Sequence, residues 1–333
     1  MRRSLLAASL AAAFSLPAAA AAAEAPTVVA SIKPVHSLVA GVMQGVGSPH
    51  LIVQGGASPH ATSLKPSDAA ALERAAVVVW MGEGLEAFLA PALETLAGKA
   101  VVVELAEAPG LTRLAYREGG PWDEHEEEEH GDEHGEEEHA DEHGEEEHAD
   151  AEAHDEHDHD GIDMHLWLDP DNARAMVAAV AAVLSAADPG NAARYDANAK
   201  AMSGRLEALA AEIEADLAPV KDVPFVVFHD AFQYFDLRFG LNTVGSLTVN
   251  PENQPGAQRL REIQAKIAGL GARCVFAEPQ FEPRLVQVAV EGSDAKTGTL
   301  DPLGADLPDG PELYFELLRR NAASLKACLG EAS

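Results

Sequence analysis

The stretch NAARYDANAKAMSGRLEALAAEIEADLAPV, Asn191 to Val220, organises the whole sequence. Its spacing predicts one helix of about 25 residues with charged side chains on one face. The regions on both sides of it alternate short apolar runs with helical patterns. A helix of this length between two strand-rich regions predicts a rigid connection, over 189–220, between two lobes.

Four short apolar runs precede this helix and predict strands. Helical patterns separate them, including LEAFLAPALETLAG at 85–98, which predicts one helix. Apolar strands that alternate with helices indicate a parallel sheet covered on both faces. The first α/β lobe is therefore predicted at 24–118, and residues 162–188 complete it. The strand candidates are TVVASI (27–32), HLIVQ (50–54), VVVWMG (77–82) and VVVELA (101–106).

The same alternation resumes after the long helix and predicts a second α/β lobe at 221–333. The expected fold class is α/β, with two Rossmann-like lobes that contain parallel sheets and are joined by one long rigid helix. Ligands of open parallel sheets bind beyond the carboxyl ends of the strands, so functional side chains are expected there. The strand candidates are FVVFHD (225–230), LNTVGS (241–246), CVFAEPQF (274–281) and KTGTLDPLG (296–304).

The first 23 residues have the features of a secretory signal peptide. Arg2 and Arg3 precede the apolar run LLAASLAAAFSL, and small residues lead to an expected cleavage after Ala23. A transmembrane anchor is the alternative, but it needs about 20 apolar residues followed by charge. The cleavage region has no cysteine, so a lipid anchor is not expected. The mature chain is expected to be periplasmic and soluble.

Residues 119–161 form a segment rich in His, Asp and Glu. The unit EHGEEEHAD occurs twice, at 133–141 and 142–150, after a looser copy at 124–132. Residues 123–160 hold 22 of the 55 acidic side chains and no basic one, so 33 acidic against 23 basic side chains remain elsewhere. The low apolar content predicts disorder. The acidic charge and the lack of a basic patch exclude nucleic-acid binding.

Cys274 and Cys328 are the two cysteines of the chain. In an oxidising compartment, two cysteines without a third favour one disulfide. Closing a loop of about 55 residues contributes on the order of 4 kcal/mol by the chain-entropy estimate. Two buried thiols or a metal pair are the alternatives.

Five of the fourteen histidines lie outside the acidic segment. His60 follows the second strand candidate, His165 precedes a helical pattern, and His229 ends a strand candidate, so the three could meet in a cleft between the lobes. Their spacings match no local metal motif, and a loop histidine is more often a surface residue. The pattern alone leaves the site open. His36 and His50 are expected to be structural or surface residues.

Several motifs together carry a family resemblance. The chain resembles the cluster A-I solute-binding proteins of metal-specific ABC importers, most of all their ZnuA-type zinc members, over nearly the whole mature chain. The resemblance implies two α/β lobes with a metal ion buried between them, and a monomer that delivers the ion to an ABC permease in the inner membrane. The motifs are SIKPVHSLVAGVM, GGASPHATSLKPSDAAAL, DMHLWLDPDNA, FVVFHDAFQYF, CVFAEPQF, TGTLDPLG and the His-rich insertion.

The resemblance also implies a ligand set. The matching positions supply His60, His165 and His229, and Asp301 occupies a place that ligates metal in some members. Some zinc members use a Glu directly before the first histidine, where this chain has Pro59. The fourth ligand is therefore expected to be Asp301 or water.

Three further residues are expected near the site. Glu278, at a strand end, is expected to bond a ligand histidine or to cap the following helix rather than to bind metal. Trp167 and Phe232 are expected to exclude water from the site, although a role in the core is equally consistent with the sequence.

Three imidazoles favour Zn²⁺, which accepts nitrogen ligands in tetrahedral geometry. Manganese prefers oxygen, and the manganese members carry a carboxylate in place of His229. Cu²⁺ and Ni²⁺ also bind imidazole. The expected function is zinc capture for import. The alternatives are another divalent metal, a periplasmic zinc buffer or metallochaperone, and a zinc hydrolase, which is disfavoured because no HExxH helix, nucleophile elbow or phosphate loop is present.

The acidic segment is predicted to be an accessory rather than the main site. Its side chains must be ordered when they bind metal, which lowers affinity relative to a preformed cleft. We expect it to collect or sense zinc with low affinity. Its histidines are His125, His130, His134, His139, His143, His148, His154, His157 and His159.

Overall fold

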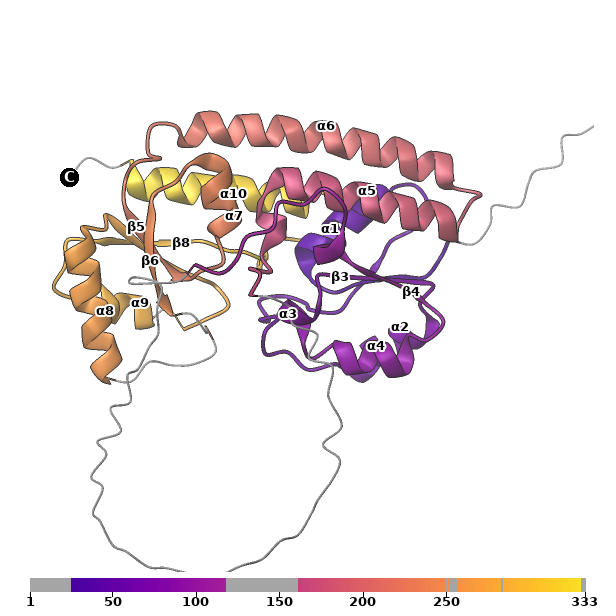
Figure 1. Ribbon diagram of the computed structural model, residues 1–333, viewed down its shortest axis with the longest axis horizontal. Helices are drawn as coiled ribbons and strands as arrows, with labels where there is room; N and C mark the ends of the chain where they lie inside the picture. The colour runs from indigo at the N-terminus through magenta and orange to yellow at the C-terminus, as the bar shows by residue number, and fades with distance from the viewer. Residues whose placement is uncertain (1–24, 118–160, 249–250, 252–256, 283, 331–333) are drawn as a thin grey trace, which may run out of the picture.

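The computed structural model describes residues 25–117, 161–248, 251, 257–282 and 284–330 (Figure 1). The predicted signal peptide and the histidines of the acidic segment lie outside the described residues. None of the helices in the described part of the chain is long and apolar enough to cross a membrane.

The first lobe contains a parallel four-stranded sheet in the order β2-β1-β3-β4. Its strands are β1 (Val28–Ala30), β2 (His50–Leu51), β3 (Val77–Trp80) and β4 (Val101–Glu104). Every residue of β1 and β3 is buried, as expected for central strands that are covered on both faces. The edge strand β4 departs from this expectation, because Val101 is 51% exposed and Val102 is 42% exposed.

The helices of the first lobe begin at residues suited to a first turn. Asp169 caps α5, because its side chain accepts a hydrogen bond from the Asp171 amide at 2.8 Å. The single helix predicted at 85–98 is wrong: Pro91 lies in the first turn of a second helix, where its missing N–H costs no hydrogen bond. The helices are α1 (Lys33–Val42), α2 (Pro66–Arg74), α3 (Glu83–Glu86), α4 (Ala90–Leu96), η1 (Leu105–Glu107), η3 (Leu166–Leu168) and α5 (Pro170–Ala187).

The connecting helix α6 (Ala192–Leu217) has 26 residues, and Figure 1 shows it running along both lobes. The second lobe repeats the topology of the first, with the parallel order β6-β5-β7-β8. The predicted fold class is therefore confirmed. The elements of this lobe are β5 (Phe225–His229), α7 (Gln233–Phe239), β6 (Thr243–Thr248), α8 (Ala257–Leu270), β7 (Cys274–Ala277), α9 (Arg284–Ala289), β8 (Lys296–Thr299) and α10 (Leu313–Leu329).

One hydrophobic core runs through both lobes. It includes Val77 of the first sheet and Phe225 of the second, together with the buried sides of α5, α6 and α10. A smaller cluster lies on the opposite face of the second sheet, where Val226 contacts the buried side chains of α8. Neighbouring residues of β5 thus enter different clusters, as the two-residue period of a strand requires.

Helix α10 belongs to the second lobe by sequence but also contacts the first. The Tyr314 amide donates to Ser37 Oγ at 3.0 Å, and the Tyr314 hydroxyl donates to the Trp167 carbonyl at 2.6 Å. In the loop before α10, the Leu307 carbonyl accepts from Lys33 Nζ at 2.7 Å. These bonds join the lobes and add to the connection made by α6.

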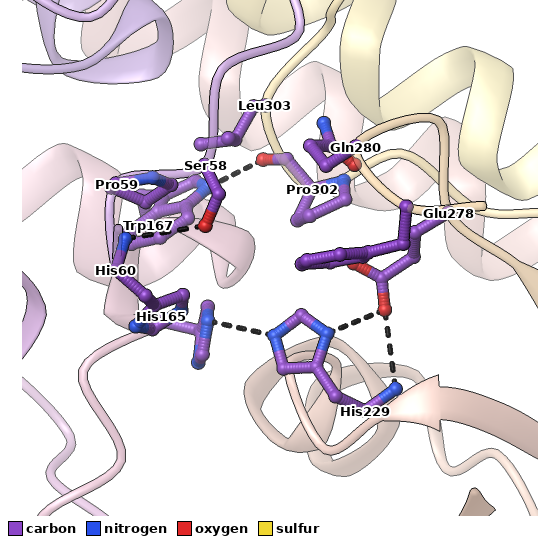
Figure 2. A pocket seen from close by; sticks show the side chains of 11 residues that line it. Ser58, Pro59, His60, His165, Trp167, His229, Glu278, Gln280, Pro302 and Leu303 are labelled. Atoms are coloured by element: carbon purple, nitrogen blue, oxygen red, sulfur yellow. Dashed lines mark hydrogen bonds and ion pairs between the residues drawn. The ribbon is translucent and has the colours of Figure 1, made fainter. Parts of the chain in front are cut away.

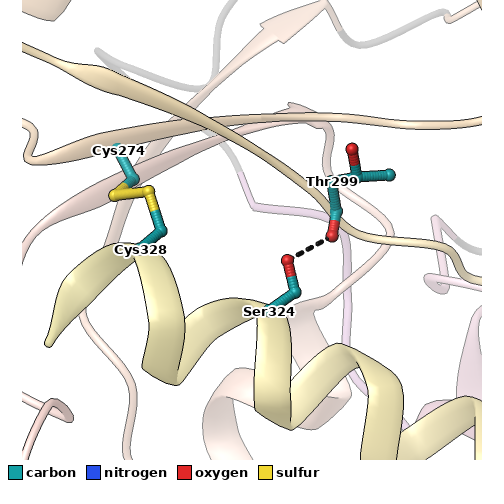
Figure 3. The surroundings of a disulfide bond; sticks show 4 residues. All are labelled: Cys274, Thr299, Ser324 and Cys328. Carbon is teal, nitrogen blue, oxygen red and sulfur yellow. Dashed lines mark hydrogen bonds between the residues drawn. A yellow bond between two sulfur atoms is a disulfide. The ribbon is translucent and has the colours of Figure 1, made fainter.

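A disulfide joins Cys274, at the start of β7, to Cys328, near the end of α10 (Figure 3). Its Cα atoms are 6.3 Å apart, so the predicted pairing is confirmed. One turn earlier in α10, Ser324 Oγ donates to the Thr299 carbonyl of β8 at 2.6 Å. The last turns of α10 are thus held against two strands of the second sheet.

Candidate metal centre

Three histidines from separate segments meet between the lobes (Figure 2). His60 lies in the loop between β2 and α2, His165 directly precedes η3, and His229 is the last residue of β5. His229 therefore lies at the carboxyl end of a parallel strand, which is where ligands of such sheets bind.

The geometry of the three imidazoles suits one metal ion. Each histidine offers a ring nitrogen within 4.8 Å of those of the other two. The Nε2 atoms of His165 and His229 are 3.3 Å apart. Two nitrogens that bind zinc at about 2.0–2.1 Å with tetrahedral angles lie roughly 3.3 Å apart. This pair is thus already spaced as two ligands of a tetrahedral ion.

Two buried carboxylates orient these rings. Asp163 Oδ1 lies 2.7 Å from Nδ1 of His165, and Glu278 Oε1 lies 2.6 Å from Nδ1 of His229. Asp163 Oδ1 also accepts the amide N–H of His165 at 3.0 Å. A carboxylate that accepts the Nδ1 proton leaves the Nε2 lone pair free for a metal.

The structure therefore places Glu278 against the candidate ligand His229. Asp163 was missed by the sequence reasoning. Its signal was present in the motif DMH, because a carboxylate two residues before a histidine can bond both its amide and its ring.

His60 supplies the third imidazole of the group, from the loop between β2 and α2. The residue is exposed on its loop, but its ring centroid lies 5.6 Å from that of His165 and 5.9 Å from that of His229. Desolvation of the ring, with smaller contributions from the two neighbouring histidines, lowers the pKa of His60 to about 3. The ring is neutral at physiological pH, as a metal ligand must be.

The structure does not bring Asp301 into this group. Its Oδ1 accepts from the backbone amides of Leu303 and Gly304 and from Nε2 of Gln280, and its Oδ2 accepts from the amide of Ala305 at 2.6 Å. These bonds use both carboxylate oxygens to close the loop after β8. Asp301 thus shapes the pocket wall that Pro302 and Leu303 contribute.

The rest of the pocket is mostly apolar. Trp167 packs against His165 with ring centroids 5.3 Å apart, and its Nε1 donates to the Pro302 carbonyl at 2.8 Å. Phe281 contacts His229 edge-on. Phe232 is buried in the core beside Phe235 and is not among the lining residues. The pocket is lined by Ser58, Pro59, His60, His165, Trp167, His229, Glu278, Gln280, Phe281, Pro302 and Leu303.

The two remaining described histidines lie outside the group. His36 is buried with Nε2 at 3.2 Å from the Pro49 carbonyl, and burial is the main cause that lowers its pKa. His50 Nε2 lies 3.0 Å from Asp68 Oδ1. Both have structural partners, as expected.

Two parallel α/β lobes, one long connecting helix and a histidine group between the lobes define the class as a two-lobed solute-binding protein of the cluster A-I type. The model of the family described as zinc-uptake complex component A, periplasmic, matches residues 28–328. The chain belongs to this family, ZnuA.

Related sequences match this chain over nearly its full length and theirs. A high-affinity zinc uptake system protein ZnuA of Brucella suis biovar 1 is 55% identical over 309 residues, covering 91% of this chain and 92% of the relative. One of Paracoccus denitrificans is 42% identical over 322 residues, covering 96% of this chain and 97% of the relative. Among solved structures, the laminin-binding protein Lmb of Streptococcus agalactiae, described as an adhesin with metal transporting activity, matches with a TM-score of 0.69 and 27% identity over 91% of this chain and 99% of its own.

Proposed function

We propose that the protein captures Zn²⁺ between its lobes and delivers it to an ABC permease in the inner membrane. The observation that carries this proposal is the convergence of His60, His165 and His229, with two Nε2 atoms already at the spacing of zinc ligands. The names of the relatives as high-affinity zinc uptake proteins support the same function.

The donor set favours zinc over manganese. All three converging ligands are nitrogens, and the carboxylates nearest to them bond Nδ1 protons. Manganese prefers oxygen ligands. We propose that water supplies the fourth position, because the oxygens of Asp301 already accept four hydrogen bonds from its own loop and from Gln280.

We further propose that the chain is exported through the signal peptide at 1–23, works as a monomer in the periplasm and catalyses no reaction. Residues 119–161 act in this proposal as an accessory segment that collects or senses zinc with low affinity. Its alternation of histidine with carboxylate supports this role, since a segment that served only solubility would need the carboxylates alone.

The test is competition for Zn²⁺ with a chromophoric chelator, using the parent and the variants His60→Ala, His165→Ala and His229→Ala. Each variant is expected to lose more than about 100-fold in affinity at the tight site, because losing a ligand costs more than losing the partner of a ligand. His50→Gln is the matched control, and its affinity is expected to equal that of the parent. Parental affinity in all three variants would show that the site lies elsewhere.

A second experiment separates the tight site from the accessory segment. Deleting residues 123–160 is expected to leave one tightly bound ion and to remove several weakly bound ones. Loss of the tight ion in that deletion would favour a zinc buffer built on the acidic segment. Normal growth in zinc-limited medium of a strain that lacks the whole protein would contradict the import function.

A further inference from the structure

The acidic segment leaves and rejoins the first lobe through a short antiparallel stem, formed by residues 114–117 and 161–163. Ala115 pairs with Ile162, the Tyr116 amide donates to the Gly161 carbonyl at 2.8 Å, and the Asp163 amide donates to the Leu114 carbonyl at 2.9 Å. The returning strand of the stem ends at Asp163, which orients His165. The stem is thus covalently next to the candidate metal centre.

Helix α7 of the second lobe holds this stem. The Tyr234 hydroxyl accepts the Leu114 amide at 3.0 Å and donates to the Asp163 carbonyl at 2.8 Å, so it bonds both strands of the stem. Gln233 Nε2 donates to the Ala115 carbonyl at 3.1 Å. Because α7 follows directly after β5 and His229, these bonds fix the segment of one ligand relative to that of another.

Arg117, the last described residue of the outgoing strand, adds a charged contact. Its guanidinium lies 2.8 Å from Asp236 Oδ2 of α7 and 3.4 Å from Oδ1 of Asp230, the residue after His229. Asp236 is 5% exposed and Asp230 is 15% exposed. Removing the cation from such a group leaves buried negative charge that the protein must compensate by rearrangement.

We infer that Arg117 is a positioning residue for the zinc site. Its positive charge balances the negative charges of Asp230 and Asp236. It thereby holds the stem, and with it Asp163 and His165, in position relative to His229. The inference rests on the proposed function of the three-histidine site. It also assigns a role to the base of the acidic segment, so a deletion that reaches Arg117 is expected to damage the site, whereas deletion of 123–160 spares it.

The test uses the full chain with Arg117→Gln, in the same chelator competition, together with chemical unfolding of the metal-free protein. Zinc affinity is expected to fall about 10-fold, the lower end of the usual cost of losing a residue that supports a metal ligand. Arg113→Gln is the matched control, because the ion pair of Arg113 is with the exposed Glu107 rather than with Asp230 or Asp236. Its affinity is expected to equal that of the parent. A merely structural role would lower the free energy of unfolding and leave the affinity unchanged.

Two more variants sharpen the result. Arg117→Gln combined with Asp236→Asn removes one charge of each sign and is expected to bind zinc more tightly than Arg117→Gln alone. Arg117→Lys keeps the charge without the two-pronged guanidinium, and is expected to bind between the parent and Arg117→Gln. If Arg117→Gln does not fold, Arg117→Lys decides: weaker binding supports the inference and parental affinity overturns it.

The outcome also separates this inference from the function on which it rests. Parental affinity in the Arg117 variants, with loss of tight binding in His165→Ala, would overturn the positioning role alone. Parental affinity in His165→Ala as well would overturn the zinc site itself.

Discussion

At the scale of single residues, the proposed metal centre depends on carboxylates that are not themselves proposed as ligands. A buried carboxylate bonds Nδ1 of each of His165 and His229, which leaves Nε2 of both rings available to the proposed ion and sets the tautomer before metal arrives. His60 is held differently: its ring lies beside the other two imidazoles, and its backbone amide, rather than its ring, donates to Ser58 Oγ at 3.3 Å. The three ligands are therefore held with unequal rigidity.

Replacing Glu278 by Gln tests this arrangement. The amide oxygen can still accept the Nδ1 proton of His229, but the negative charge that strengthens the ligand is lost. We expect zinc affinity to fall by about 10-fold, measured by chelator competition. Glu312→Gln is the control, since Glu312 pairs with Arg205 on the exposed surface. Equal affinities for the two variants would contradict the role of Glu278.

A second carboxyl, Glu86 of α3, gives a prediction about pH and stability. It is fully buried, and its Oε2 accepts the amides of Met81 and Gly82 at 2.8 and 3.2 Å. Burial, helped by Glu104, raises the pKa of Glu86 from 4.5 to about 7. Because the pKa of Glu86 is raised in the folded protein, the stability that this group contributes to the fold is complete below pH 4.5. That contribution is lost as the pH rises through 7.

The variant Glu86→Gln keeps an acceptor for both amides and cannot ionise. Its free energy of unfolding, relative to the parent, is expected to rise by about 3 kcal/mol between pH 4.5 and pH 8. Urea unfolding of both proteins at the two pH values, in the presence of a chelator, measures this change. A constant difference between the variant and the parent would show that Glu86 stays ionised in the fold.

At the scale of elements, α10 shows how a terminal helix connects the parts of the molecule. It packs on α6, with exposed ion pairs between Arg319 and Glu212 and between Lys326 and Asp216. Such surface pairs contribute little individually. The buried face of α10 and the disulfide at its end are the larger contributions, because they restrict the chain as well as bury it.

Removing the disulfide with Cys274→Ser and Cys328→Ser is therefore expected to lower the free energy of unfolding by about 4 kcal/mol, since the bond closes a loop of 54 residues. Urea unfolding of the double variant measures it. The zinc affinity of the folded double variant is expected to stay at the parental value, because the bond lies at the opposite end of β7 from Glu278. A loss of zinc affinity in the folded double variant would mean that the disulfide sets the position of the carboxyl end of β7, which Glu278 follows.

At the scale of the whole molecule, the two lobes share one core. Residues of both sheets and of α5, α6 and α10 pack in a single cluster, and polar bonds such as that from Lys33 to the Leu307 carbonyl join the lobes. The proposed metal centre lies between two lobes that these contacts already join. Its proposed ligands come from both of them, so a bound ion is expected to stabilise the assembly of the lobes rather than either lobe alone.

Calorimetry is accordingly expected to show one unfolding transition. Free Zn²⁺ at 100 times its dissociation constant is expected to raise the free energy of unfolding by about 2.7 kcal/mol and to move the whole transition. In His165→Ala the same zinc concentration is expected to cause a much smaller shift. Two transitions, of which zinc moves one, would show that the lobes unfold independently.

Local sequence was sufficient for the strands, the long helix and the α/β class. The two-residue and 3.6-residue periods of β5 and α6 are properties of consecutive residues, and each segment carries them without its partners. Cysteine count alone favoured the pairing of Cys274 with Cys328. The break at Pro91 was also readable, because the ring of proline acts on its own helix.

The metal centre needed tertiary contacts. His60, His165 and His229 share no local motif, and their meeting was expected from family resemblance rather than from spacing. The bond from Glu278 to His229 spans 49 residues and that from Arg117 to Asp236 spans 119. The two oxygens of Asp301 could have faced either the ion or their own loop. Only packing chooses between such options, because the energy of a carboxylate depends on the partners and the burial that the finished fold provides.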